Sequence, residues 1–246
     1  KNSPSFRYSM SDPKTPGTLF LVPTPIGNLS DMTFRAVDTL KAVSLVACED
    51  TRTSGVLLNH YGIETPRTSL HAHNEHGKVP RIVEKMILGD DVALISDAGT
   101  PGISDPGYLL TRAALDAHLR VEALPGATAL IPALAASGLP TDKFVFEGFL
   151  PPKKGRQTRI KLLVEEDRTV VFYESPHRLG KLLTQLASFA GDDRQAVVAR
   201  EISKKFEEYA RGSLEELIEW ATAQTRIRGE CVVLLASRKA SERINP

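Results

Sequence analysis

The sequence lacks the glycine patterns of the common nucleotide-binding loops. No two of its 17 glycines are separated by a single residue, so the dinucleotide-binding fingerprint is absent. Gly102 and Gly107 have P-loop spacing, but Tyr108 and Leu109 follow where that loop needs Lys and Ser or Thr. A G-x-S-x-G motif is also missing, which excludes the nucleophile elbow of α/β-hydrolases. These absences disfavour NAD, FAD and P-loop nucleotide chemistry.

Cysteines and long apolar runs are equally scarce. Cys48 and Cys231 are the only cysteines and both lie beside apolar runs, so we expect two buried thiols in a reducing, cytoplasmic compartment. No run reaches the roughly 18 apolar residues that a membrane span needs, so no membrane partner is predicted. Residues 1–16 are polar, contain prolines and have no apolar core, which predicts a flexible tail rather than a signal peptide. Lys and Arg number 31 against 30 Asp and Glu, so net charge identifies no partner.

From residue 18 onward, apolar runs alternate with amphipathic segments, which is typical of an α/β fold. The expected strands are 18–23, 44–48, 92–96, 120–123, 143–147, 169–173, 195–201 and 230–236. The expected helices are 34–43, 53–61, 80–88, 108–118, 127–137, 156–165, 177–189 and 214–223. In the second half, 196–201, 206–211 and 230–236 are candidate antiparallel neighbours. The Ser-Gly-Leu-Pro at 137–140 predicts a boundary between an N-terminal α/β domain, 17–138, and a C-terminal α/β domain, 139–246.

Segment 92–107, VALISDAGTPGISDPG, predicts a buried strand that ends in a stiff loop. Gly99, Gly102 and Gly107 allow the main chain to approach a ligand closely, while Pro101 and Pro106 restrict the loop. In open α/β sheets, ligands bind beyond the carboxyl ends of the strands. An elaborate connector is the alternative, but we interpret this segment as a binding loop.

Two further loops follow strand ends in the same half. Segment 22–36, VPTPIGNLSDMTFRA, is stiffened by prolines, and Asp31 is a candidate cap for the next helix. Segment 124–130, LPGATAL, opens a helix with small residues and brings main-chain N–H groups and the Thr128 hydroxyl toward a ligand. A capped connector in the first loop and a plain turn at Gly126 remain open alternatives.

Polar clusters elsewhere are less decisive. YESPHRL at 173–179 starts a helix with Ser and Pro, but Glu174, His177 and Arg178 are an unusual polar load for a buried edge. EDTR at 49–52 is either an ion-pair corner or part of a polar substrate floor. The histidines at 71, 73 and 76 lack the spacing of a metal-binding pair, so no metal is predicted.

Basic residues gather in the second half of the chain. KKGRQTRIK at 153–161 holds five cations and no acid, and further cations follow at positions 200–211, 226 and 228. Such runs usually form solvated helix faces. Their segregation in one half of a neutral chain suits a phosphate-rich substrate.

Together, these motifs resemble a known family. TPIGNLSDMT, ACEDTR, SDAGTPGISDPG, SGLPTDKFVFEGFLP, YESPHRL and the RGE before the last strand are similar to the ribosomal RNA small subunit methyltransferase I family of the tetrapyrrole-methylase-like superfamily. The resemblance runs from about Gly17 to Ala236. It implies two α/β domains of the tetrapyrrole-methylase type, with the cofactor in the cleft between them, in a homodimer. Family members usually continue past the last strand into a basic helical segment.

The implied activity is S-adenosylmethionine-dependent 2′-O-methylation of a cytidine ribose in 16S rRNA of the small ribosomal subunit. Motif by motif, the resemblance assigns cofactor contacts, largely through main-chain groups, to Pro25, Ile26, Gly99, Thr100, Pro101, Gly102, Ile103, Thr128, Ala129 and Tyr173. The two alternatives are methylation of a small tetrapyrrole, which the 6% aromatic content disfavours, and a cofactor-sensing RNA-binding module without catalysis.

Catalytic and RNA-binding residues are expected among the remaining polar groups. A base for the ribose 2′-hydroxyl proton is expected from Asp97 or Glu174 and, with less support, from His73 or Lys204. The cations expected to bind rRNA phosphates are Lys153, Lys154, Arg156, Arg159, Arg178 and Lys204. Neutralising Lys153, Lys154 and Arg156 together is expected to flatten the salt dependence of RNA binding.

Overall fold

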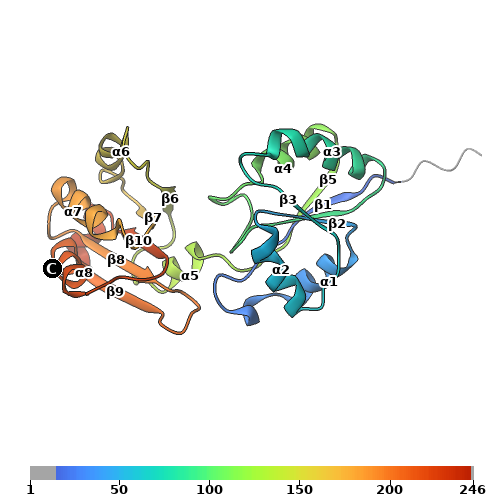
Figure 1. Ribbon diagram of the computed structural model, residues 1–246. Helices are drawn as coiled ribbons and strands as arrows, with labels where there is room; N and C mark the ends of the chain where they lie inside the picture. The colour runs from blue at the N-terminus through green and yellow to red at the C-terminus, as the bar shows by residue number, and fades with distance from the viewer. Residues whose placement is uncertain (1–14, 245–246) are drawn as a thin grey trace, which may run out of the picture. The chain divides into compact units, whose positions relative to one another are not determined.

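The structure is a computed structural model that describes residues 15–244. Two compact units divide the chain (Figure 1). Unit 1 runs up to Val22 and includes Thr33–Asp97 and Pro101–Pro125, whereas unit 2 comprises Pro23–Met32, Ala98–Thr100 and the chain from Gly126 onward. The predicted tail, 1–16, lies outside the described residues except for Thr15 and Pro16.

Unit 1 is a parallel sheet between two layers of helices. The strands are β1 (Thr18–Leu21), β2 (Leu45–Cys48), β3 (Arg67–Ser69), β4 (Val92–Ile95) and β5 (Arg120–Ala123), in the order β3-β2-β4-β1-β5. One face is covered by α3 (Glu75–Ile87) and α4 (Tyr108–Asp116), and the other by α1 (Phe34–Ala42) and α2 (Thr51–His60) (Figure 1). All four β4 residues are buried, as expected for a strand covered on both faces. The parallel α/β prediction is confirmed for this unit.

Unit 2 is built on a mixed sheet. Its strands are β6 (Phe144–Phe149), β7 (Thr169–Glu174), β8 (Gln195–Arg200), β9 (Glu208–Ser213) and β10 (Cys231–Leu235), in the order β6-β7-β10-β8-β9. Only β6 and β7 pair in parallel; the predicted antiparallel pairing of β8 with β9 and with β10 is confirmed. The helices are α5 (Leu130–Ala135), α6 (Arg156–Leu163), α7 (Leu179–Ala190), α8 (Leu214–Ala223) and α9 (Arg238–Ile244).

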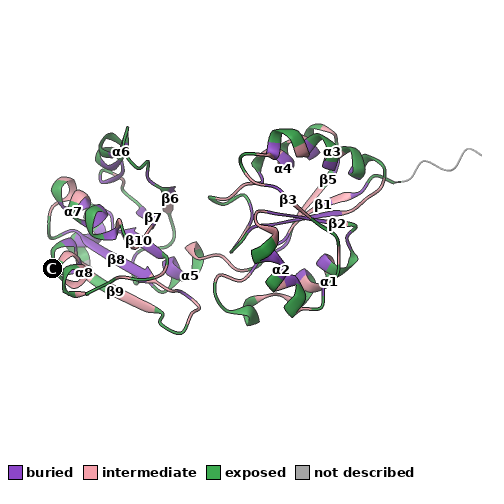
Figure 2. Cartoon of the chain, in the orientation of Figure 1, coloured by how far each residue is buried: buried purple, intermediate pink, exposed green. Residues whose placement is uncertain are grey.

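Alternate residues of the unit 2 strands enter two different cores. Phe172 and Val233 pack with Ile160 of α6 and Leu183 of α7 on one face. Val171, Val197 and Leu234 pack with Ala133 and Leu134 of α5 on the other face. Buried residues accordingly run along the strands in Figure 2, while the outer helix faces are exposed. The period-two alternation of strands explains this division.

Several elements differ from the sequence prediction. Helix α3 begins at Glu75, earlier than predicted, with Pro80 inside the helix. The predicted cap Asp31 lies instead in a 3-10 turn, η1 (Leu29–Asp31), and Thr33 caps α1 by accepting a hydrogen bond from the Ala36 N–H at 3.1 Å. The boundary at residue 138 stays a prediction; helix α5, which precedes it, packs on the unit 2 sheet. None of the helices among residues 15–244 has the length and apolarity to cross a membrane.

Candidate functional site

The first two predicted binding loops meet at Thr24 and Gly99 in unit 2. Each residue donates its main-chain N–H to the carbonyl oxygen of the other, both at 2.9 Å. Gly99 has φ +83°, a left-handed conformation that favours glycine, and a Cβ there would lie 3.5 Å from Ile26 Cγ2. The Thr24 side chain is 1% exposed, so the junction is a fixed part of the unit. Sequence analysis did not single out Thr24.

The third predicted loop joins the same junction. The Thr100 hydroxyl donates to the Ala127 carbonyl at 3.1 Å, and a Cβ on Gly99 would lie 4.0 Å from Thr128 Cα. A Cβ on Gly126 would lie 2.7 Å from Pro23 Cβ, so glycine stands there because the main chain approaches Pro23 closely. Unit 2 thus brings together predicted cofactor residues from three separate loops. These residues are Pro25, Ile26, Gly99, Thr100, Thr128 and Ala129.

The remainder of the glycine-proline loop belongs to unit 1. Pro101 is buried, whereas Gly102 is exposed at φ +84° with no atom within 4 Å of a Cβ built there. Ile103 is 42% exposed. The far end of the loop is fixed by Glu75, a buried residue whose carboxylate accepts the Gly107 N–H at 3.0 Å. No sequence motif marked Glu75, since its partner lies 32 positions away.

Asp97 lies at an acidic corner formed by the ends of β2 and β4. Its carboxylate is exposed and accepts the Asp50 N–H at 3.2 Å. The pKa of Glu49 is raised, first by burial and then by the charge of Asp97. Arg52 lowers the pKa of Asp50 to about 2 through a hydrogen-bonded ion pair of 2.9 Å. The EDTR segment is therefore an ion-pair corner that also places a second carboxylate beside Asp97.

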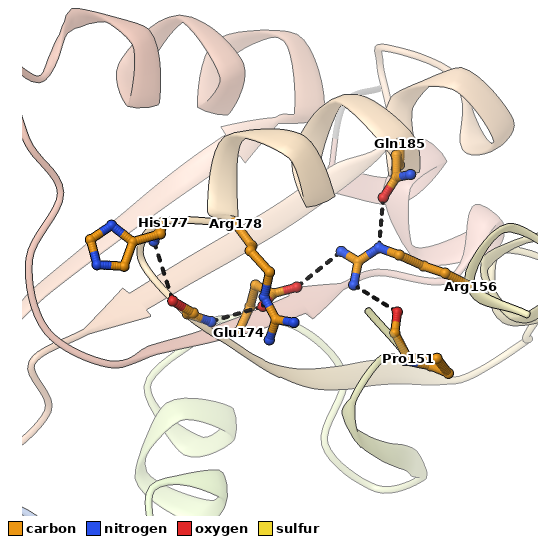
Figure 3. Close-up of polar contacts among 7 residues, drawn as sticks. Pro151, Arg156, Glu174, His177, Arg178 and Gln185 are labelled. Atoms are coloured by element: carbon orange, nitrogen blue, oxygen red, sulfur yellow. Dashed lines mark hydrogen bonds and ion pairs between the residues drawn. The ribbon is translucent and has the colours of Figure 1, made fainter. Parts of the chain in front are cut away.

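Glu174 is enclosed by cations (Figure 3). Its carboxylate accepts hydrogen bonds from Arg156 Nη2 and from the Ser175 N–H, both at 2.9 Å, and forms an ion pair with Arg178 Nε at 2.8 Å. The side chain is 1% exposed. A buried carboxylate paired with two arginines is well suited to fix the strand end and is shielded from a substrate. Its burial therefore favours the exposed Asp97 over Glu174 as the base.

Arg156 also differs from its predicted role. Its side chain is 4% exposed and donates to Gln185 Oε1 at 2.8 Å as well as to Glu174 (Figure 3). The first turn of α6 directs it toward the end of β7 rather than outward. Because its guanidinium is buried and paired, Arg156 is a weaker candidate for binding RNA phosphates than the exposed lysines before it.

The other predicted RNA-binding cations differ in how far their charges are already paired. Arg159 pairs with Glu147 at 2.6 Å, and Lys204 pairs with Glu201 at 3.0 Å while its stem covers Gly27. Arg178 stays 38% exposed beside its ion pair. Lys153 and Lys154 are exposed, and neither forms an ion pair within residues 15–244. Among the predicted RNA-binding cations, Lys153 and Lys154 are therefore the ones whose charge is exposed and not paired with a carboxylate.

Aromatic side chains line the end of β7. The Tyr173 ring has edge contacts with Phe146 at 5.0 Å and with Phe149 at 5.6 Å between centroids. Phe149 was not predicted as a site residue. The sequence signal that could have marked Phe149 is Gly148 before it, because a glycine inside a strand often indicates a bulge.

The histidines at 71–76 do not form a cluster of their own. His71 Nε2 lies 3.0 Å from Asn74 Nδ2, and His73 is exposed with its ring 6.0 Å from that of His71. Across residues 15–244, no three His, Cys, Asp or Glu side chains are grouped so as to hold a metal ion.

This chain matches a family model and also resembles individual proteins in sequence. The family model for Tetrapyrrole (Corrin/Porphyrin) Methylases matches residues 18–218. Ribosomal RNA small subunit methyltransferase I of Pseudomonas aeruginosa is 52% identical over 92% of this chain and 81% of the relative. The protein of that name from Synechocystis sp. is 50% identical over the same shares, 92% and 81%.

The fold is similar to that of a solved methyltransferase. Uroporphyrin-III C-methyltransferase from Thermus thermophilus, complexed with S-adenosylhomocysteine, aligns with a TM-score of 0.63 at 19% identity, covering 93% of this chain and 100% of that one. That identity supports a common fold and no more. The family match and the two close relatives decide the assignment: this chain belongs to the tetrapyrrole methylase family and, within it, to the ribosomal RNA small subunit methyltransferase I group.

Proposed function

We propose that this protein transfers a methyl group from S-adenosylmethionine to the ribose 2′-hydroxyl of a cytidine in 16S rRNA of the small ribosomal subunit. The observation that supports this proposal best is the junction at Gly99, where the loops predicted to bind the cofactor meet. The chain also belongs to a family of methylases. The rRNA substrate is supported by the names of relatives about half identical to this chain. The activity would take place in the cytoplasm, where ribosomal subunits are found, and we propose a homodimer as the working form.

The residues at the junction suit a cofactor held through main-chain groups. Gly99 leaves open the space that a Cβ would fill between Ile26, Ala127 and Thr128. The cofactor would be held by Pro25, Ile26, Gly99, Thr100, Thr128, Ala129 and Tyr173, with Pro101, Gly102 and Ile103 as further contacts. S-adenosylmethionine supplies an activated methyl group, so the chain's main task is to hold the acceptor in place. Such positioning lowers a barrier by roughly 7–11 kcal/mol.

Asp97 is our candidate for the group that receives the hydroxyl proton. Its carboxylate is exposed, oriented by the Asp50 N–H, and sits at the carboxyl end of a central strand. A positioned base contributes about 10²–10⁴ in rate. We propose no such role for Glu174, whose side chain is buried and paired with two arginines.

Phosphates of the RNA are proposed to contact Lys153 and Lys154, with Arg178 as a further cation. Arg159 and Lys204 have carboxylate partners and would contribute less. A tetrapyrrole substrate, the main alternative within the fold family, would need an open, apolar cleft. A cofactor-sensing RNA-binding module without catalysis is the second alternative.

Calorimetry and a labelling assay test this proposal. We expect S-adenosylmethionine to bind and NAD and ATP not to bind. Labelled methyl groups should enter the RNA of isolated small ribosomal subunits and not a uroporphyrinogen. Label in the uroporphyrinogen alone would support the tetrapyrrole alternative, and tight RNA binding without label would support the non-catalytic module.

A matched pair of glycine variants tests the binding loop. Gly102 and Gly62 both have positive φ, +84° and +60°, and open space around a Cβ. Valine at either position is strained by about 1–2 kcal/mol. Gly102→Val should also weaken S-adenosylmethionine binding, whereas Gly62→Val should not. Equal cofactor affinity in the two variants would remove the loop from the site.

A further inference from the structure

Phe149 ends β6 in an exposed position beside an aromatic partner. It is 54% exposed, although Gly148 before it and Leu150 after it are both buried. In the parallel pairing of β6 with β7 it stands opposite Tyr173, whose ring it contacts at 5.6 Å. The Phe149 ring is therefore exposed at the end of the strand.

A β-bulge directs Phe149 to this side of the sheet. Strict alternation would place Phe146 and Phe149 on opposite faces, because they are an odd number of residues apart. The register of β6 against β7 shifts between Phe146 and Gly148, and Gly148 adopts φ +69°, which favours glycine. Both phenylalanines consequently contact the same Tyr173 ring. Bulges of this kind re-aim a side chain and are frequent beside functional sites.

Unpaired positive charge follows directly along the chain. Pro151 and Pro152 stiffen the segment after the strand, and Lys153 and Lys154 come next, both exposed and without an ion pair among residues 15–244. Lys153 and Lys154 are four and five residues beyond Phe149, so their Cα atoms lie at most about 14 and 18 Å from that of Phe149, which is the span of a few nucleotides. An exposed aromatic ring next to such cations is the combination by which proteins bind single-stranded nucleic acid.

We propose that Phe149 is the platform on which one base of the RNA substrate stacks while Lys153 and Lys154 hold neighbouring phosphates. This inference rests on the proposed rRNA methyltransferase function and identifies the substrate at that site as unpaired RNA. Stacking uses the π face that every base has, so Phe149 contributes affinity and positions the strand without selecting a base. Leucine in its place would keep apolar surface but offer no π face.

Binding of a short single-stranded RNA to the full chain tests the platform. Phe149→Ala and Phe149→Leu should each weaken binding by about 5- to 100-fold, whereas Phe149→Trp should bind as the wild type does. Phe34→Ala is the matched control, since Phe34 is 94% exposed on α1 of unit 1 and should leave RNA binding unchanged. The proposed function is tested separately on the wild-type protein, which must bind RNA and methylate rRNA.

Fluorescence distinguishes stacking from charge attraction. Trp220 is the only native tryptophan, so wild-type protein gives the background for Phe149→Trp. RNA should quench the added indole, and an abasic strand of the same length should not. Unchanged RNA affinity in Phe149→Ala, when the wild type is active, would overturn the inference while the proposed function stands. Loss of S-adenosylmethionine binding instead, or a change of oligomeric state in that variant, would equally overturn it.

Discussion

The carboxylate of Glu174 and the guanidinium of Arg156 form an ion pair of 2.9 Å in which both side chains are almost fully buried. The pair links the end of β7 to the first turn of α6, and Arg178 completes it at the surface. Two arginines surround one glutamate, so the cluster retains one positive charge, carried by the partly exposed Arg178. This pairing favours a structural role at the strand end for a motif that suggests acid–base chemistry.

Removing Arg156 should destabilise the fold. Arg156→Ala leaves the buried Glu174 with Arg178 as its remaining ion-pair partner, and we expect the free energy of unfolding to fall by about 3 kcal/mol. Arg168→Ala, which breaks the exposed pair with Glu166, should cost at most about 1 kcal/mol. Urea denaturation of both variants measures the difference, and equal losses would contradict the structural role of the buried pair.

Replacing each carboxylate by its amide should distinguish the roles of Asp97 and Glu174. Asp97→Asn should lower kcat by about 10²–10⁴, because the proposed proton acceptor is lost. Glu174→Gln should lower stability but keep kcat close to that of the wild type in the folded fraction. The assignment would be reversed if Glu174→Gln lost that rate and Asp97→Asn retained it.

The paired lysines should account for part of the salt dependence of RNA binding. Replacing Lys153 and Lys154 with Gln should lower the slope of log K against log salt by about 1.4, since each contact with single-stranded RNA contributes about 0.7. The double replacement of Lys41 and Lys85, which are exposed on unit 1 helices, is the control for net charge. An equal slope in wild type and test variant would mean that the lysines form only a solvated surface.

Both cysteines should resist thiol reagents in the folded protein. Burial raises the pKa of Cys231 from 9.0 to about 12, and it also raises the pKa of Cys48. At pH 8 the thiolate of Cys231 is then about 10³-fold rarer than in the unfolded chain. The unfolded chain loses its proton first, so stability should decrease as pH rises from about 9 to 12. Rapid alkylation of native protein at pH 8 would contradict this account.

Local patterns predicted the fold well because they depend on neighbouring residues. The apolar run of β4 and the glycines and prolines after it indicated a buried strand and a binding loop, and Gly99 indeed joins the predicted loops. Arg156 could not be separated from Lys153 and Lys154 by sequence, since only its distant partner Glu174 decides which cation is buried. The Asp31–Ser203 hydrogen bond, between residues 172 positions apart, is likewise invisible to local patterns.

The position and chemistry of the transferred methyl group test the central proposal most directly. Small ribosomal subunits that lack the modification are incubated with the protein and labelled S-adenosylmethionine, and their RNA is then hydrolysed with alkali. A 2′-O-methyl group blocks attack of that oxygen on the adjacent phosphate, so the account predicts label in an alkali-resistant dinucleotide that begins with cytidine. Label released on a mononucleotide, on a base, or on a nucleoside other than cytidine would contradict it.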